Sequence, residues 1–171
     1  SIRDLLTHTS GIGYAVIGSP EANAIYAKNN IPVGIENPHA SLAEAMERLG
    51  KLPLFHDPGT KYLYGLNTDV LGYLVEVVSG KTLSDFLKER LFVPVGMNDT
   101  YFYLPENKQA RLATLYTEDK EKKTVKVALH GSPLAKDGNI LENYPRMKGS
   151  YYSGGAGLSS TALDYAVFLQ M

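Results

Sequence analysis

The chain contains no cysteine and no tryptophan among its 171 residues. The absence of cysteine excludes disulfide bonds, zinc sites built from thiolates and catalysis by a thiol. It does not fix the compartment, so a periplasmic, an extracellular and a cytoplasmic location all remain open. No apolar run approaches the ~18 residues that a membrane-spanning helix requires. We therefore expect no membrane span.

An excess of charge of one sign is also missing, since 17 Lys and Arg residues face 18 Asp and Glu residues. Domains that bind nucleic acids usually carry a strong basic excess, so we expect no nucleic-acid partner. The histidines show no metal-binding spacing, and each is expected to be a structural or surface residue. They are His8, His39, His56 and His130. We expect neither a metal nor a cofactor.

Familiar nucleophile and phosphate motifs are absent. No serine is followed by a lysine three residues later, and there is no G-x-S-x-G sequence. The segment Ser79–Thr82 resembles the end of a phosphate-binding loop, but that loop needs a glycine where Val75 stands, and it follows a strand. We therefore predict an ordinary turn between two helices at this point.

The apolar periodicity predicts a mostly helical domain. Helices are expected near residues 2–8, at Pro20–Lys28, after a Ser41 cap with Glu44, at Asn67–Val78, from Thr82 to about Leu91, and after Ser160 or Thr161. Asp69 and Glu76 are expected to be solvated carboxylates on a helix face. The last helix has an apolar face that includes Leu163 and Leu169.

Two segments have the residue composition of β-strands. Leu112–Tyr116 and Thr124–Leu129 flank the charged segment Glu118–Lys123, a pattern that predicts an antiparallel hairpin. Residues 130–158 are rich in Gly, Pro, Ser and Tyr and are expected to form a loop. The predicted fold class is therefore α+β, mostly helical, with a small antiparallel hairpin, and residues 1–171 are expected to form a single domain.

Tyr64 is the residue most suggestive of chemistry. It follows the turn Pro58-Gly59 and precedes the helix that begins near Asn67. A helix N-terminus is electropositive and offers free N–H groups, which suits a polar catalytic group. A phenol acts as a base near neutral pH only with help from a nearby cation or a proton network. The sequence shows no obvious cation, so we expect the other catalytic groups to lie elsewhere.

Several short motifs follow one another along the chain. They are Ile2–Gly11, Pro58–Thr60 with Tyr64, Leu71-Gly72 with Ser79-Gly80, Pro94–Met97, and Gly154–Thr161 followed by Asp164-Tyr165. In this order the motifs resemble the serine hydrolases of the β-lactamase-like group, which includes class C β-lactamases, related esterases and D-alanyl-D-alanine peptidases. The resemblance implies the helical subdomain of the β-lactamase/transpeptidase-like fold.

The resemblance also implies which parts are present. The family's S-x-x-K motif and its K-T-G or H-x-G motif do not occur in this chain. We therefore expect the chain to be a fragment of a larger serine hydrolase, inactive alone, with the flanking α/β region outside it. By resemblance, Tyr64 is the tyrosine of the second motif, which takes part in proton transfer through an acyl-enzyme cycle.

Six further residues are predicted to bind substrate. Leu66 occupies the position of the asparagine in the lactamase motif Y-x-N, and leucine offers neither a donor nor an acceptor. Asn67 is one residue further along. The remaining four line the expected cleft at a flexible loop, and they are Tyr151, Tyr152, Gly154 and Gly155. An ordinary surface loop remains an equal alternative for that segment.

Leu66 resembles the Y-S-L variant of the related esterases. We therefore favour ester or peptide-like substrates over efficient β-lactam hydrolysis. A β-lactamase or D-alanyl-D-alanine carboxypeptidase is the first alternative, and a non-catalytic binding module of the same fold is the second. The predicted partner is thus a small-molecule ester, β-lactam or peptide. An exposed domain interface would also allow self-association.

Overall fold

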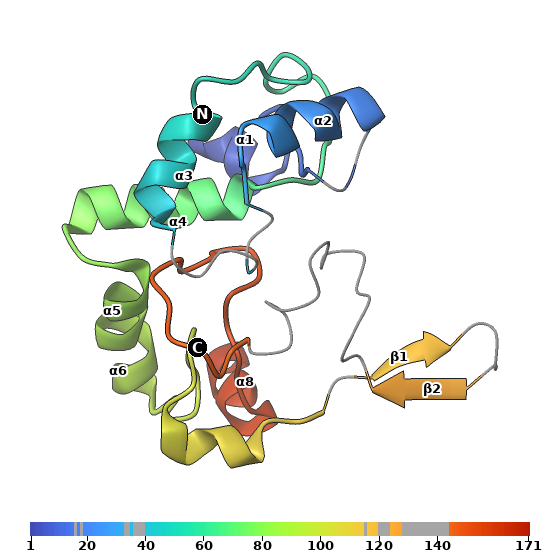
Figure 1. The fold of residues 1–171 in the computed structure, drawn as a ribbon. Coiled ribbons are helices and arrows are strands. Elements are labelled where there is room, and N and C mark those ends of the chain that lie inside the picture. Colours follow the sequence, from blue (N-terminus) through green and yellow to red (C-terminus); the bar gives the residue numbers. More distant parts are fainter. Residues whose placement is uncertain are drawn as a thin grey trace.

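The computed structural model describes residues 1–15, 17, 19–32, 35, 40–114, 116–119, 124–127 and 144–171. Within them the helices are α1 (Ile2–Leu6), α2 (Pro20–Lys28), α3 (Leu42–Leu49), α4 (Asn67–Ser79), α5 (Leu83–Leu87), α6 (Val93–Val95) and α8 (Ala162–Leu169). A π-helical turn at Lys88–Phe92 joins α5 to α6, and a 3-10 helix spans Glu106–Arg111. The described part is mostly helical, as the periodicity predicts (Figure 1).

Side-chain caps begin α1 and α3. Ser1 and Asp4 form a capping box at α1, and the predicted box of Ser41 and Glu44 is present at α3. Each box satisfies backbone N–H groups that a helix leaves unpaired at its start. One face of α3 is buried, and it consists of Leu42, Ala45, Met46 and Leu49.

Helix α4 is central to the described part, because α1, α3 and α5 all pack against it. It ends at Gly80, whose left-handed conformation (φ 68°) closes a helix without steric strain. Two of its valines, Val77 and Val78, are exposed rather than packed. The buried residues of α4 are Asn67, Asp69 and Gly72. Polar side chains therefore take buried positions in the first turn of this helix.

The helix predicted to run from Thr82 to about Leu91 is longer than expected. The Thr82 hydroxyl oxygen accepts the Asp85 N–H at 3.0 Å and caps α5. The chain then widens into the π-helical turn and continues through α6, which contains Pro94. It ends at Gly96, which has a φ of 80°. The sequence pattern did not show that a π-helical turn would carry the helix past a proline.

Two short strands, β1 (Tyr116–Asp119) and β2 (Thr124–Val127), pair antiparallel and project away from the helices (Figure 1). The predicted position of the first strand was wrong. Residues 112–114 have no regular structure, and β1 begins only at Tyr116. It therefore extends into the segment expected to be a charged turn. The tip at residues 120–123, the end of the predicted second strand at residues 128–129 and the first part of the predicted loop at residues 130–143 lie outside the described residues, as do His39 and His130.

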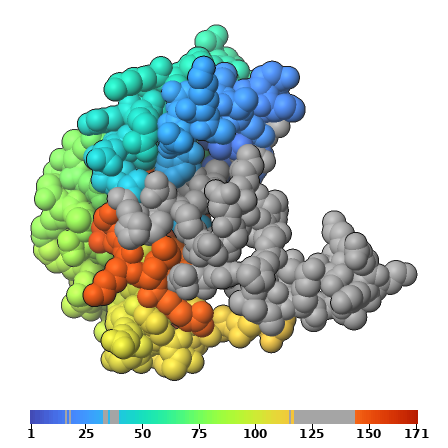
Figure 2. Space-filling view, viewed as in Figure 1, coloured from blue at the N-terminus to red at the C-terminus, as the bar shows by residue number. Residues whose placement is uncertain are grey.

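The core lies beneath α2, α3 and the start of α4. Its buried apolar residues come from the first half of the chain and from residue 151, and they are Tyr14, Tyr26, Ile31, Ala40, Leu42, Ala45, Met46, Leu49, Leu66 and Tyr151. In the space-filling view, the orange segment that begins at residue 144 lies between the N-terminal segments and the yellow segment that follows residue 100 (Figure 2). This arrangement brings residue 151 against helices that are far away in the sequence.

Helix α8 presents its apolar side to the surface. Leu163 is 73% exposed and Leu169 is 67% exposed, so the apolar face expected for this helix is not covered by the described residues. Asp164 is buried instead, and it accepts the Asp99 N–H and the Thr100 hydroxyl, each at 2.8 Å. In the part of the chain that the structure describes, no helix has both the length and the apolarity to cross a membrane.

Candidate active site

Tyr64 lies at the entrance of α4, and 44% of its side chain is exposed. The main chain around it runs beside residues 8–13. The Leu63 N–H donates to the His8 carbonyl at 2.8 Å, and the Leu66 N–H donates to the Gly13 carbonyl at 3.2 Å. These bonds fix the backbone on both sides of Tyr64 while leaving part of the phenol accessible.

Gly65 permits this close approach. A Cβ atom at position 65 would lie 2.2 Å from the Ile12 carbonyl oxygen and 2.6 Å from the Gly13 Cα. Both neighbours are backbone atoms, so no side-chain rotation could relieve the clash. A glycine between Tyr64 and Leu66 is therefore a steric requirement of the site.

Two aromatic rings flank Tyr64. The His8 ring lies 5.0 Å from it and the Tyr14 ring 5.4 Å, measured between ring centroids. Burial raises the pKa of Tyr14, and the nearby Asp69 carboxylate and Tyr64 hydroxyl raise it further. Tyr14 therefore keeps its proton at neutral pH. Its hydroxyl is suited to donate a hydrogen bond toward the Tyr64 oxygen.

His8 is held in place by Asn67. The backbone of His8 is left-handed, with a φ of 53°, which is uncommon for a residue other than glycine. Asn67 Nδ2 lies 2.9 Å from His8 Nδ1 and 3.5 Å from the Ile12 carbonyl oxygen. The Asn67 amide donates this hydrogen bond, so Nδ1 of His8 acts as the acceptor. The Ser10 hydroxyl donates to Asn67 Oδ1, so every polar atom of the amide has a partner.

Asp69 corrects an expectation from the sequence. It was expected to be a solvated carboxylate, but it is fully buried in the first turn of α4. Burial raises its pKa, and this effect outweighs the opposing effect of the Ser153 hydroxyl, the Gly155 N–H and the Tyr151 hydroxyl. Those donors face the carboxylate, although neither of its oxygens accepts a hydrogen bond of good geometry.

The glycine loop packs directly on the start of α4. A Cβ at Gly154 would lie 2.3 Å from the Thr68 carbonyl oxygen. A Cβ at Gly155 would lie 2.9 Å from Asp69 Oδ2 and 3.1 Å from the Tyr14 hydroxyl oxygen. The structure thus brings Gly154 and Gly155 to the same end of α4 as Tyr64, with Tyr14 between the loop and the phenol.

Three predicted substrate-binding residues are enclosed. Leu66 and Asn67 are fully buried, and Tyr151 belongs to the core. The backbone carbonyl of Tyr151 accepts the Tyr103 hydroxyl at 2.8 Å. The structure gives these residues contacts within the domain rather than an exposed surface. Contact of Leu66, Asn67 or Tyr151 with a substrate stays a prediction.

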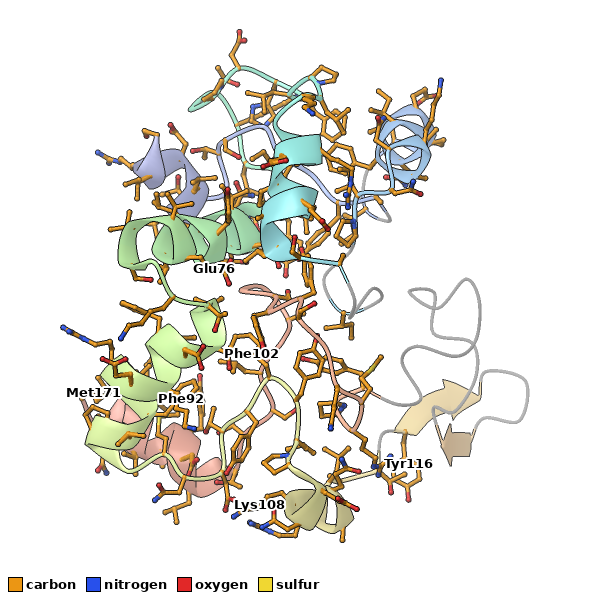
Figure 3. All side chains as sticks on the ribbon, turned by 60° about the vertical axis from the view of Figure 1, so that its left-hand side comes forward. Glu76, Phe92, Phe102, Lys108, Tyr116 and Met171 are labelled. Carbon is orange, nitrogen blue, oxygen red and sulfur yellow. The ribbon has the colours of Figure 1, made fainter. Side chains whose placement is uncertain are left out.

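Tyr152 lies toward the other end of α4. Burial is the largest cause that raises the pKa of Tyr152. The carboxylates of Asp85 in α5 and of Glu76 in the C-terminal half of α4 raise it further. It lines a cavity of about 550 Å³ together with residues such as Phe92 and Phe102. Figure 3 shows Glu76, Phe92 and Phe102 on the same side of the molecule, and Phe92 and Phe102 mark the cavity there. Tyr152 is therefore not brought beside Tyr64.

Sequence reasoning missed three residues of the site. His8 was expected to be structural, Tyr14 had no distinguishing pattern, and Asp69 was expected to be solvated. One signal for Asp69 was present: an acidic residue in the first turn of an otherwise apolar helix. Among the described residues, no three or more His, Asp or Glu side chains gather as a metal site would require.

Known proteins similar to this chain include esterases and acyltransferases. A family model described as Beta-lactamase matches residues 1–171. Lovastatin esterase of Penicillium rubens is 32% identical over 174 residues, covering 99% of this chain and 39% of that enzyme. Esterase EstB of Burkholderia gladioli is 32% identical over 173 residues, covering 96% of this chain and 42% of that enzyme.

The solved structure of EstCE1, a hydrolase with promiscuous acyltransferase activity, has a TM-score of 0.78 to this chain at 26% identity. The match covers 99% of this chain and 45% of EstCE1. The chain therefore spans less than half the length of the relatives that it matches.

Proposed function

Because the chain belongs to the beta-lactamase family, we propose that it supplies part of the active site of a serine hydrolase that cleaves esters through an acyl-enzyme. The observation that carries the proposal is the partly exposed Tyr64 phenol at the entrance of α4, flanked by His8 and Tyr14. The nucleophilic serine and the lysine beside it come from a part of the protein outside residues 1–171.

In this proposal Tyr64 moves the proton. The serine oxygen attacks the ester carbonyl as its proton passes to the phenol oxygen, and the phenol passes its own proton to the lysine amine. The same phenol then returns the proton to the oxygen of the leaving alcohol, and water hydrolyses the acyl-enzyme by the reverse sequence. His8, which is fixed by Asn67, limits the movement of the Tyr64 ring.

Two side chains support an ester over an amide substrate. Leu66 is buried and has no polar group, so it cannot bind a substrate amide. The Asn67 amide is occupied by His8, Ser10 and the Ile12 carbonyl. An amide or β-lactam would therefore lack a hydrogen bond worth about 0.5–1.5 kcal/mol.

Acyl transfer to an alcohol is the second candidate. An acyl-enzyme can be released by water or by an alcohol, and only the acceptor differs. EstCE1, to which this chain is similar, is a hydrolase with promiscuous acyltransferase activity. That likeness favours an acceptor alcohol as an alternative to water.

The experiment uses the full-length gene product that contains this chain. We expect saturable hydrolysis of p-nitrophenyl acetate, slow or no hydrolysis of nitrocefin, and an acetylated serine detected by mass spectrometry after rapid quenching. Residues 1–171 alone should be inactive. Added butanol should yield butyl acetate if acyl transfer competes with hydrolysis.

Each alternative has its own result. Efficient nitrocefin hydrolysis or covalent capture of a fluorescent penicillin would favour a β-lactamase or a D-alanyl-D-alanine carboxypeptidase. No turnover and no acyl-enzyme with any of these substrates would favour a non-catalytic binding module. Turnover by residues 1–171 alone would contradict the proposed division of the site.

A further inference from the structure

The buried carboxylate of Asp69 has no role in the proposed chemistry, yet its position is costly. An ionisable group that is fully enclosed loses its hydration, and the loss is compensated only by strong partners. Neither oxygen of Asp69 has a hydrogen bond of good geometry. A site needed only for packing would be filled at lower cost by an apolar side chain of similar size.

Two of the three groups that face Asp69, Ser153 and Gly155, belong to the turn at residues 153–157. Ser153 Oγ accepts the Gly155 N–H at 3.3 Å and the Ala156 N–H at 3.1 Å. The Ser153 carbonyl accepts the Gly157 N–H at 3.0 Å. Since Ser153 Oγ already accepts two bonds, its own proton is available to the Asp69 carboxylate. The carboxylate therefore lies at the base of this turn.

Tyr14 connects the same carboxylate to Tyr64. The Gly155 Cβ position lies within about 3 Å of both Asp69 Oδ2 and the Tyr14 hydroxyl oxygen, at 2.9 and 3.1 Å. The Asp69 carboxylate and the Tyr14 hydroxyl therefore both border Gly155. On its other side, the Tyr14 ring contacts the Tyr64 ring.

We propose that Asp69 is a positioning residue that holds the Ser153–Gly157 turn on α4 and, through the Tyr14 hydroxyl, orients the phenol of Tyr64. The orientation of the Tyr64 phenol by Asp69 rests on the proposed function. The role of Asp69 in holding the turn does not depend on activity.

Asp69→Asn tests the proposal with almost no change in shape. The amide has one acceptor oxygen, and its NH₂ group would face the donors Ser153, Gly155 and Tyr151. In the full-length protein we expect kcat for p-nitrophenyl acetate to fall about fivefold or more, with KM within about twofold. Tyr14→Phe should do the same. The double variant should be no slower than the slower single variant, because both act on one contact.

Hydrogen exchange provides a readout that needs no turnover. In Asp69→Asn the amides of Gly155, Ala156 and Gly157 should exchange about tenfold faster than in the wild type. The matched control is Glu76→Gln, the same chemical change about two turns further along α4. It retains an acceptor for the Leu83 N–H, which Glu76 binds at 2.8 Å. It should alter neither kcat nor the exchange of the turn.

The outcomes separate the two proposals. Two results with an active wild type would overturn the inference and leave the proposed function intact. One is an unchanged kcat in Asp69→Asn, and the other is a loss of kcat in the double variant equal to the product of the two single losses. If the wild type is inactive, the proposed function fails, and unchanged exchange of the turn in Asp69→Asn would overturn the inference as well. If Asp69→Asn does not fold, Tyr14→Phe decides: a kcat within about twofold of the wild type overturns the proposal.

Discussion

Asn67 donates an amide proton to Nδ1 of His8 across 2.9 Å, although 59 residues separate them in the sequence. This bond ties the first turn of α4 to the loop after α1. It sets the tautomer of the imidazole and places the ring 5.0 Å from the ring of Tyr64. The environment of the phenol thus depends on a residue that has no exposed surface of its own.

Asn67→Ala should destabilise the protein by about 2–3 kcal/mol, because the Ser10 hydroxyl and the Ile12 carbonyl would lose a buried partner. Chemical denaturation followed by circular dichroism measures the change. The matched control is Asn98→Ala, since Asn98 is exposed and its side chain donates to the Gly96 carbonyl at 3.1 Å. Equal losses for the two variants would show that the Asn67 contacts contribute little.

Gly65→Ala should lower both stability and activity. Its Cβ would lie 2.2 Å from the Ile12 carbonyl oxygen, so the two backbone segments must separate and carry Tyr64 with them. We expect a loss of about 2 kcal/mol or more in unfolding free energy. Gly50→Ala is the control, because Gly50 has a φ of −63° and its nearest neighbour would be 3.4 Å away. That variant should be neutral or slightly more stable.

The stability contributed by Asp69 should depend on pH in a defined direction. Burial raises the pKa of this carboxyl above its ordinary value of 3.8, so the folded state binds the proton more tightly than the unfolded state. The resulting stabilisation is complete below the ordinary value and is lost as the pH rises through the raised one. The Tm of Asp69→Asn relative to the wild type should therefore increase between about pH 4 and about pH 7.

Asp99→Asn serves as a comparison, because the pKa of Asp99 is shifted in the opposite direction to that of Asp69. Hydrogen bonds from Lys108 and then Arg111 lower the pKa of Asp99, so its contribution is present above the ordinary value and is lost in acid. The relative Tm of Asp99→Asn should therefore fall as the pH rises. Calorimetry measures both relative Tm values as a function of pH. If both changed in the same direction, burial would not be the dominant effect on the pKa of Asp69.

Local signals in the sequence predicted much of the helical framework. The cap at Ser41, the proline that opens α2 and the glycine after Ser79 each act within a few residues, and each marks a helix end that the structure contains. The predicted start of the first strand was wrong, because residues 112–114 have no regular structure. The π-helical turn at Lys88–Phe92 gives no comparable signal.

The residues predicted for the candidate site include Tyr64, Asn67, Gly154 and Gly155 but not the two rings that flank the phenol. His8 and Tyr14 reach it through long-range packing, which no periodicity within a segment encodes. Asp69 was misjudged because helical spacing predicts which residues share a face but not whether a distant loop covers that face. The cover is supplied by Gly154 and Gly155, about 85 residues downstream, and only the close approach of glycine backbone to α4 makes it fit.

The most direct test of the account compares Tyr64→Phe with Tyr62→Phe in the full-length protein, using the steady-state hydrolysis of p-nitrophenyl acetate. Tyr62 is a suitable control because it is 66% exposed and its ring also lies near His8, at 5.9 Å. We predict that Tyr64→Phe lowers kcat at least about tenfold while KM changes little, and that Tyr62→Phe keeps the wild-type rate. Equal rates for the wild type and Tyr64→Phe would contradict the account.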